Sequence, residues 1–330
     1  MLSNDSGSSV DIMLGNPKRA LLKMSIPLII SLLISSLYNL IDAAWVSGLG
    51  ADALAGVGFF TPIFMILVGF GNGLGAGAAF AISKYIGEEN KSKADNASVH
   101  SIFIDIIVSL VTTSILFIFL EMILNAMGAG QTINYAMDYG NIILFGSVFV
   151  ILSNALYGIF RGEGDTKRPM YAMVASAVLN MILDPIFIYT LNLGVKGAAI
   201  ATIISAIFVI LMLVYWFYIK KDTYLKPVLS NFNFQKDIGF DIIKVGIPAS
   251  IQLLNNAFFA AVFSALLAFI SSTDSVAVYS TGWRIVIIGT TPILAVGTAL
   301  ISVIAANYGA KNYKNIQIAH RYAMKVSIVI

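Results

Sequence analysis

Long apolar segments dominate this sequence and constrain its fold more than any other feature. A membrane-spanning helix takes about 20 predominantly apolar residues. Eight segments qualify: 22–46, 53–83, 98–124, 134–159, 169–191, 196–219, 242–270 and 275–306. A ninth begins near Ala319 and runs to the end at Ile330. Because only 11% of the residues are charged, the sequence predicts an all-α, polytopic membrane protein with about eight full spans and part of a ninth.

Basic residues fall on one side of the predicted spans. Of the 20 Lys and Arg residues, 18 lie before the first span, in alternate loops or at the helix ends beside those loops. Only Lys196 and Arg284 fall elsewhere. Because basic loops stay in the cytoplasm, we expect a multi-pass protein of the cell membrane whose N-terminus is cytoplasmic.

The chain also contains an internal repeat. Residues 23–27 (KMSIP) match 244–248 (KVGIP) at an offset of 221, and after one inserted residue the offset becomes 222. At that offset the loop 87–90 (GEEN) corresponds to 309–312 (GAKN). An even number of spans separates the copies, so both halves have the same orientation. Parallel repeats of this kind are one known plan for transporters.

The repeat and the longest polar connection divide the chain into parts. We expect a polar leader over 1–15, a first six-helix lobe over 16–221, a cytoplasmic linker over 222–241 and a partial second lobe over 242–330. The second lobe would hold helices seven to nine. The apolar end of the chain suggests that it is truncated inside the ninth helix.

Two acidic residues, Asp42 and Asp184, lie within or near the outer halves of apolar helices. An ionised Asp at the centre of a membrane helix costs ~2.5–3.5 kcal/mol, so such a residue usually faces a cavity or a partner. Asn180 shares a helix face with Asp184. Pro185 leaves a backbone carbonyl nearby without its helical donor.

Other polar side chains could complete a site around these two acids. They are Tyr38, Asn39, Tyr139, Thr202 and Ser205. Carboxylate, amide and hydroxyl oxygens suit a hard cation such as Na⁺. The same set suits a buried carboxyl group with a raised pKa that exchanges a proton. The alternative is a hydrogen-bond network that only joins the helices.

Two loops carry a family resemblance. The loop after the fourth span reads Arg161-Gly-Glu-Gly-Asp-Thr-Lys-Arg-Pro-Met170, and the loop after the second reads Ser83-Lys-Tyr-Ile-Gly-Glu-Glu-Asn90. With the Ile-Pro starts of the first and seventh helices, they resemble the multidrug and toxic compound extrusion (MATE) family, in its archaeal, DinF-like branch. The motif positions of the first loop are Arg161, Gly162, Gly164, Asp165, Lys167 and Pro169.

The resemblance implies two six-helix bundles around a cleft and export of small organic cations in exchange for H⁺ or Na⁺. It places cation coupling, including a possible Na⁺ site, on Asp42, Asn180, Asp184 and Thr202, with Tyr139 near. Tyr38, Asn39 and Ser205 would support that site, and Pro27 could act as a hinge. The seventh helix carries Gln252, Asn255 and Asn256 but no acid, so coupling is expected in the first lobe.

Several other functions are disfavoured. The chain has no cysteine and a net charge of +3 without a basic stripe, so thiol chemistry and a nucleic-acid partner are not expected. We expect no enzyme activity, no cofactor and a monomer in membrane lipid. The glycine-rich segment 69–77 suits helix packing better than nucleotide binding. A lipid-linked oligosaccharide flippase of the same superfamily and a non-transporting fragment remain alternatives.

Overall fold

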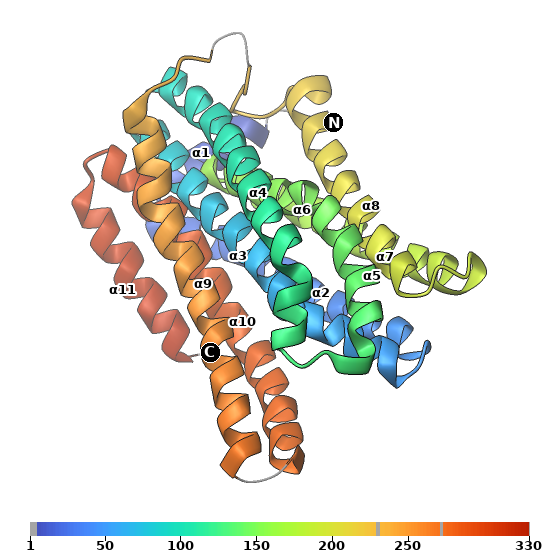
Figure 1. Cartoon of the computed structure of the whole chain (residues 1–330). Coiled ribbons are helices and arrows are strands. Elements are labelled where there is room, and N and C mark those ends of the chain that lie inside the picture. Colours follow the sequence, from blue (N-terminus) through green and yellow to red (C-terminus); the bar gives the residue numbers. More distant parts are fainter. Residues whose placement is uncertain (1–4, 229–231, 271–272, 330) are drawn as a thin grey trace.

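The computed structural model describes residues 5–228, 232–270 and 273–329, and every regular element in these ranges is helical (Figure 1). The elements are α1 (Asp5–Leu14), α2 (Pro17–Ser47), α3 (Ala51–Gly87), α4 (Lys91–Ala126), η1 (Gly130–Thr132), α5 (Ile133–Phe145), α6 (Ser147–Gly162), α7 (Lys167–Pro185), η2 (Ile186–Thr190), α8 (Val195–Val214), η3 (Tyr215–Lys220), α9 (Lys236–Ile270), α10 (Thr273–Gly309) and α11 (Tyr313–Val329). Two short continuations, η2 and η3, are π-helical.

The predicted all-α, polytopic membrane fold is confirmed. Among the described residues, 6 helices are long and apolar enough to cross a membrane, or 7 if α5 and α6 form one bent span. Those two helices meet at 54°, and Gly146 stands between them. A side chain there would collide with Ile203, because an added Cβ would lie 2.4 Å from its Cδ1. Helices α9 and α11 are also present, but they are not among these candidate spans. Eight full spans therefore remain a prediction.

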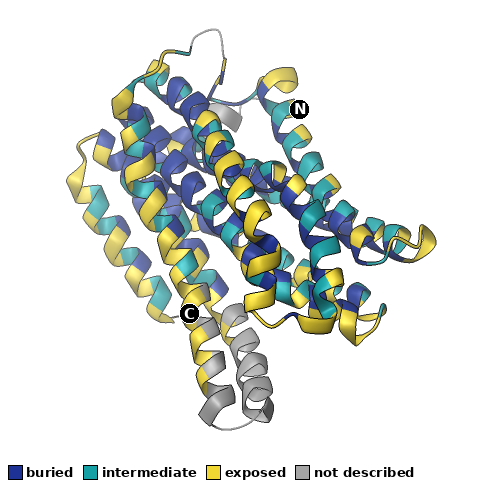
Figure 2. Ribbon diagram, viewed as in Figure 1, coloured by how far each residue is buried: buried dark blue, intermediate teal, exposed yellow. Residues whose placement is uncertain are grey.

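Apolar side chains cover the outside of the helices, where a soluble protein would carry charge. Figure 2 shows exposed residues along the outer faces and buried ones toward the middle of the molecule. Helix α4 exposes Ile107, Leu110, Ile118 and Met122 to more than half of their area. A surface of this kind suits lipid rather than water.

Helix α3 is central, and its glycines let neighbouring backbones approach closely. Its most extensive contacts are with α9 and α6. A Cβ at Gly73 would lie 2.0 Å from the Ser250 Oγ of α9, and a Cβ at Gly158 of α6 would lie 2.1 Å from the Gly75 carbonyl. The predicted packing role of segment 69–77 is therefore confirmed.

The two repeat copies form the same turn. Glu89 and Lys311 both have left-handed backbones, with φ of 58° and 55°. Asn90 and Asn312 follow them, and each side chain accepts a hydrogen bond from the backbone N–H three residues later. These bonds satisfy donors at the starts of α4 and α11, which otherwise lack helical partners.

The repeat-related glycines at the ends of α3 and α10 bring these two helices into reciprocal contact. A Cβ at Gly87 would lie 1.9 Å from the Ala306 carbonyl, and one at Gly309 would lie 2.0 Å from the Lys84 carbonyl. The first half of the chain is therefore joined to the second by backbone-to-backbone packing at matched positions.

Most charged contacts lie at one end of the helices, which we call the basic end. It holds the start of α2, the end of α3 and the starts of α4, α7 and α9. There Lys84 forms a 2.6 Å ion pair with Asp241 of α9. At the opposite end, Lys196 pairs with Asp138 at 3.2 Å. The side chain of Arg284 lies outside the described residues.

Replacing Gly87 by Ala should lower the apparent melting temperature of the protein in detergent. The added methyl group must displace the backbone of α10, and overpacking of this kind costs roughly 1–3 kcal/mol. Gly58→Ala, on the same helix, is the matched control, because no atom of the described residues lies within 4 Å of the added Cβ. Equal melting temperatures for the two variants would contradict the close-packing argument.

Candidate functional site

The last turns of α2 are fixed against η2, which aligns α2 with the end of α7. The Tyr189 hydroxyl donates to the Trp45 carbonyl, and the two rings meet edge to face at 6.2 Å. Gly48 leaves room for this contact, since a Cβ there would lie 2.2 Å from the Tyr189 hydroxyl. The wide π-helical turn begins after Pro185, which has no N–H to donate to the preceding turn.

This alignment brings the Asp42 and Asp184 side chains together. Their carboxyl groups lie within hydrogen-bonding reach of each other. Asp184 is fully buried and Asp42 is half-buried. In the described part of the chain, the Oδ1 atom of each has no hydrogen-bond partner. Among the described residues, no cationic side chain contributes to the electrostatics of either group. Two adjacent carboxylates in such a place need a bound cation if both are to stay ionised; without one, one of them takes up a proton.

Neutral polar groups from α5 and α8, and from the acids' own helices, surround the two acids. In the amide orientation that satisfies both ends, Asn180 Nδ2 donates to Asp184 Oδ2 at 2.8 Å and Oδ1 accepts from the Thr202 N–H at 3.3 Å. Tyr38 and Tyr139 lie near Thr202 and the two acids, and the Thr202 hydroxyl donates to the Ala198 carbonyl of its own helix at 3.1 Å. Helices α2, α5, α7 and α8 therefore meet at one cluster, which we call the carboxyl cluster.

Three other residues that the sequence analysis named lie outside this set of contacts. Ser205, three residues after Thr202, is buried, and its Oγ has no partner among the described residues. Asn39 is exposed and donates its amide to the Ser35 carbonyl of its own helix, at 2.8 Å. Pro27 is buried within α2, and it lies roughly 22 Å along the helix from Asp42.

The sequence analysis did not single out Asp105. This residue of α4 is 1% exposed, and within the described structure neither of its carboxyl oxygens has a hydrogen-bond partner. The carboxyl cluster contributes nothing to its electrostatics. A signal was available, because Asp105 is an acid inside the apolar segment 98–124. The described residues contain no group of three or more His, Asp or Glu suited to a metal ion.

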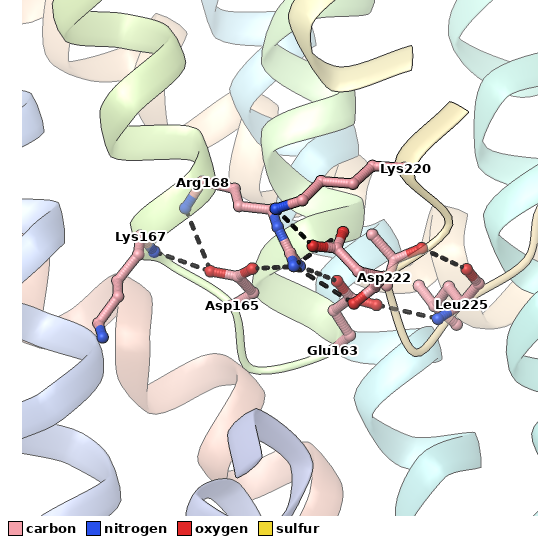
Figure 3. Close-up of polar contacts among 8 residues, drawn as sticks. Glu163, Asp165, Lys167, Arg168, Lys220, Asp222 and Leu225 are labelled. Atoms are coloured by element: carbon pink, nitrogen blue, oxygen red, sulfur yellow. Dashed lines mark hydrogen bonds and ion pairs between the residues drawn. The ribbon is translucent and has the colours of Figure 1, made fainter. Parts of the chain in front are cut away.

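The loop between α6 and α7 forms an ion-pair network at the basic end (Figure 3). Asp165 accepts from the Lys167 N–H at 2.9 Å and so caps α7. Its other oxygen pairs with Arg168 at 2.8 Å. Arg168 also pairs with Asp222 at 3.0 Å and lies 3.8 Å from Glu163. The network therefore joins the start of α7 to the segment after η3.

The remaining motif positions pack this loop against its surroundings. Gly164 has a φ of 81°, and a Cβ there would lie 2.8 Å from the Ser9 carbonyl of α1. Gly162 packs closely on α3, and the side chains of Arg161 and Pro169 are buried. Helix α1 thus covers the loop, although its sequence reads as a polar leader.

Glu163 is the buried member of this network. It is 2% exposed, and its Oε2 accepts from the Leu225 N–H at 2.9 Å. Burial raises the pKa of Glu163 to about 8, and the charge of Asp165 adds to the rise. The Leu225 N–H and the Arg168 guanidinium oppose it without cancelling it.

Glu163→Gln should flatten the pH dependence of stability between about pH 4.5 and 8. The folded state keeps a proton that an unfolded Glu, with a pKa of about 4.3, releases. Stability from this group therefore falls as pH rises through that window, whereas Gln stays neutral and can still accept from Leu225. The measurement is melting temperature from pH 5 to 9. Glu121→Gln, at an exposed position, should follow wild type, and a Glu163→Gln profile parallel to wild type would contradict the prediction.

Comparison with known proteins gives consistent matches. The sequence profile of the MatE family matches residues 27–186 and 248–330, more than half of the chain. The multidrug export protein MepA of Staphylococcus aureus is 28% identical over 313 residues, which cover 94% of this chain and 69% of that protein.

Solved structures match along nearly the whole chain. A MATE structure described as straight is 38% identical, with a TM-score of 0.93, and covers 98% of this chain and 73% of that one. One described as bent is 38% identical, with a TM-score of 0.92, over 98% and 72%. A MOP superfamily transporter from Pyrococcus furiosus, described as having a binding pocket of reverse polarity, is 39% identical, with a TM-score of 0.93, over 98% and 72%.

Proposed function

The chain belongs to the MatE family of multidrug export transporters, and on that premise we propose that it exports small organic cations in exchange for H⁺ or Na⁺. The observation that carries this proposal is the facing pair of Asp42 and Asp184, which come from different helices and have no cationic partner among the described residues. A structural network alone would not need two adjacent acids.

The carboxyl cluster has the chemistry to bind one monovalent cation. Two oxygen atoms in it have no partner in the described structure, Oδ1 of Asp42 and Oδ1 of Asp184, and Oγ of Ser205, three residues after Thr202 on α8, is also without a partner there. A proton shared by the two carboxyls, or a Na⁺ ion held by these oxygens, would remove one negative charge. Asn180 and Thr202 would then orient Asp184 rather than supply the charge.

Helix α2 connects this site to the other half of the protein. Its first half packs on α10 and α11, through contacts such as those of Leu21 and Met24 with the cluster around Ala299 and Ala319. Its second half reaches η2 and the carboxyl cluster. A change in the direction of α2 would therefore move Asp42 relative to the second half of the chain.

We place the hinge of α2 at Pro27. Proline removes the bond to the carbonyl of Lys23. On either side, Ser25 donates to the Leu21 carbonyl at 2.7 Å and Ser31 to the Pro27 carbonyl at 2.9 Å. Back-bonded hydroxyls of this kind often bend helices. Relatives have been solved in straight and bent conformations, which supports an alternation between two shapes in this chain.

The proposed cycle follows from charge. With the basic end in the cytoplasm, the carboxyl cluster lies in the outer half of the membrane. Binding of H⁺ or Na⁺ there neutralises one carboxylate and weakens attraction for the organic cation, which leaves outward. The chain, acting as a monomer, then reopens inward. The ion departs there, and the restored charge attracts the next organic cation.

Asp42→Asn and Asp184→Asn should each abolish gradient-driven efflux of a cationic dye from proteoliposomes, to the level of protein-free vesicles. Each change removes one of the two carboxyl groups, so Na⁺ or a shared proton is no longer needed to relieve the repulsion between two adjacent carboxylates. Imposing a pH gradient without Na⁺, or a Na⁺ gradient at equal pH, identifies the coupling ion in wild type.

Asp52→Asn is the matched control, because this acid of α3 is exposed. It should transport like wild type. All variants are compared after size-exclusion chromatography and melting, so that a folding defect is recognised. Wild-type efflux from a well-folded Asp42→Asn protein would contradict the assignment.

Pro27→Ala should slow efflux while leaving ion binding at the carboxyl cluster unchanged. Restoring the helical N–H stiffens α2 at the proposed hinge without touching Asp42. Transport rate and ion-dependent protection of Asp42 from carbodiimide labelling are measured together. Pro62→Ala is the control, since that proline is also inside a helix, α3, but is exposed. Equal loss of transport in both variants would contradict a hinge at Pro27.

A further inference from the structure

A polar pocket lies at the basic end, away from the carboxyl cluster. It is a cavity of about 560 Å³ between α1, α2, the start of α7 and η3. Four cationic side chains line it: Lys23, Lys167, Arg168 and Lys220. Two acids, Asp165 and Asp222, also line it. The cationic groups therefore outnumber the acidic ones.

The acids are already neutralised by two of the four cations. Arg168 pairs with both Asp165 and Asp222, and Lys220 pairs with Asp222 at 2.8 Å. Within the described residues, Lys23 and Lys167 form no ion pair. Figure 3 shows the Lys167 side chain directed away from the carboxylates. Two ammonium groups are thus left to meet an anion in the pocket.

Aromatic and apolar side chains also line the pocket. Tyr171 is 53% exposed, Trp216 is partly buried, and Ile12 and Met24 complete this part of the lining. Trp and Tyr are enriched where membrane proteins meet the interface between lipid and water. The pocket thus combines a cationic part with an apolar part at the end of two predicted spans, α2 and α7.

We propose that this pocket binds the headgroup phosphate of an anionic phospholipid. Lys23 and Lys167 would contact the phosphate, while Tyr171 and Trp216 would lie along the glycerol and the first part of the acyl chains. Basic pockets between membrane helices on the cytoplasmic side suit such headgroups. The positive end of the α7 helix dipole, at Lys167, favours the same anion. With the proposed orientation, the lipid comes from the cytoplasmic leaflet.

The proposal is tested by titrating phosphatidylglycerol into the full 330-residue chain in detergent, with binding followed by native mass spectrometry. The double variant Lys23→Gln/Lys167→Gln should bind about 25-fold more weakly, from roughly fivefold for each lysine removed. Lys23→Arg/Lys167→Arg keeps the charge and should bind like wild type. Phosphatidylcholine should bind weakly to all three.

The matched control is Lys18→Gln/Lys325→Gln. These two lysines are also exposed, and they line a separate depression between α2 and α11. This control should leave phosphatidylglycerol binding unchanged. An equal loss in the control would mean attraction by total charge alone and would overturn the proposal.

Two further measurements test whether the bound phosphate belongs to a lipid and whether a lost signal comes from a lost fold. Inorganic phosphate at millimolar concentration should not displace the lipid; complete displacement would mean a site for free phosphate and would overturn the lipid assignment. Phosphatidylglycerol with brominated acyl chains should quench Trp216 in a variant whose other two tryptophans are Phe. Absence of quenching in a protein that melts like wild type would also overturn it.

Discussion

Close backbone contact between α3 and the second half of the chain is the constraint on which the rest of this structure depends. Helices in lipid gain little from hiding apolar side chains, because lipid tails are equally apolar. Small residues must then supply contact area, and α3 supplies it toward α6 and α9 through alternate glycines such as Gly73 and Gly75. At Gly87 and Gly309 the contact becomes reciprocal. The two halves are thus joined where repeat-related residues contact each other.

The carboxyl cluster depends on that frame for its geometry. Asp42 is carried by α2, whose other end is packed on α10 and α11, whereas Asp184 is carried by α7 inside the first half. The separation of the two acids is therefore sensitive to how the halves sit. Conversely, the charge of the two carboxylates acts on their separation. Without a bound cation they repel each other, and a bound cation attracts both, so occupancy of the site favours one separation over another.

Hydropathy predicted the positions of the helices because a bilayer demands long apolar segments, and the repeat predicted the matched turns at Asn90 and Asn312. Spacing alone could not choose between Tyr38 and Asn39, since both lie about one turn from Asp42. The structure turns Tyr38 to Thr202 and leaves Asn39 on its own backbone. The burial of Glu163 could not be read from sequence, because its partner Leu225 is 62 residues away and the pairing follows from the fold.

The same two helices carry both polar sites. Helix α7 begins at the network of Asp165 and Arg168 and ends beside Asp184, roughly 27 Å away along its axis. Helix α2 likewise carries Lys23 near its start and Asp42 near its end. The proposed hinge at Pro27 lies between Lys23 and Asp42, so a bend there moves Asp42 relative to Lys23. An anion held at the basic end and a cation held between the carboxyls would therefore both bias that bend. Linkage then requires each to alter the affinity for the other.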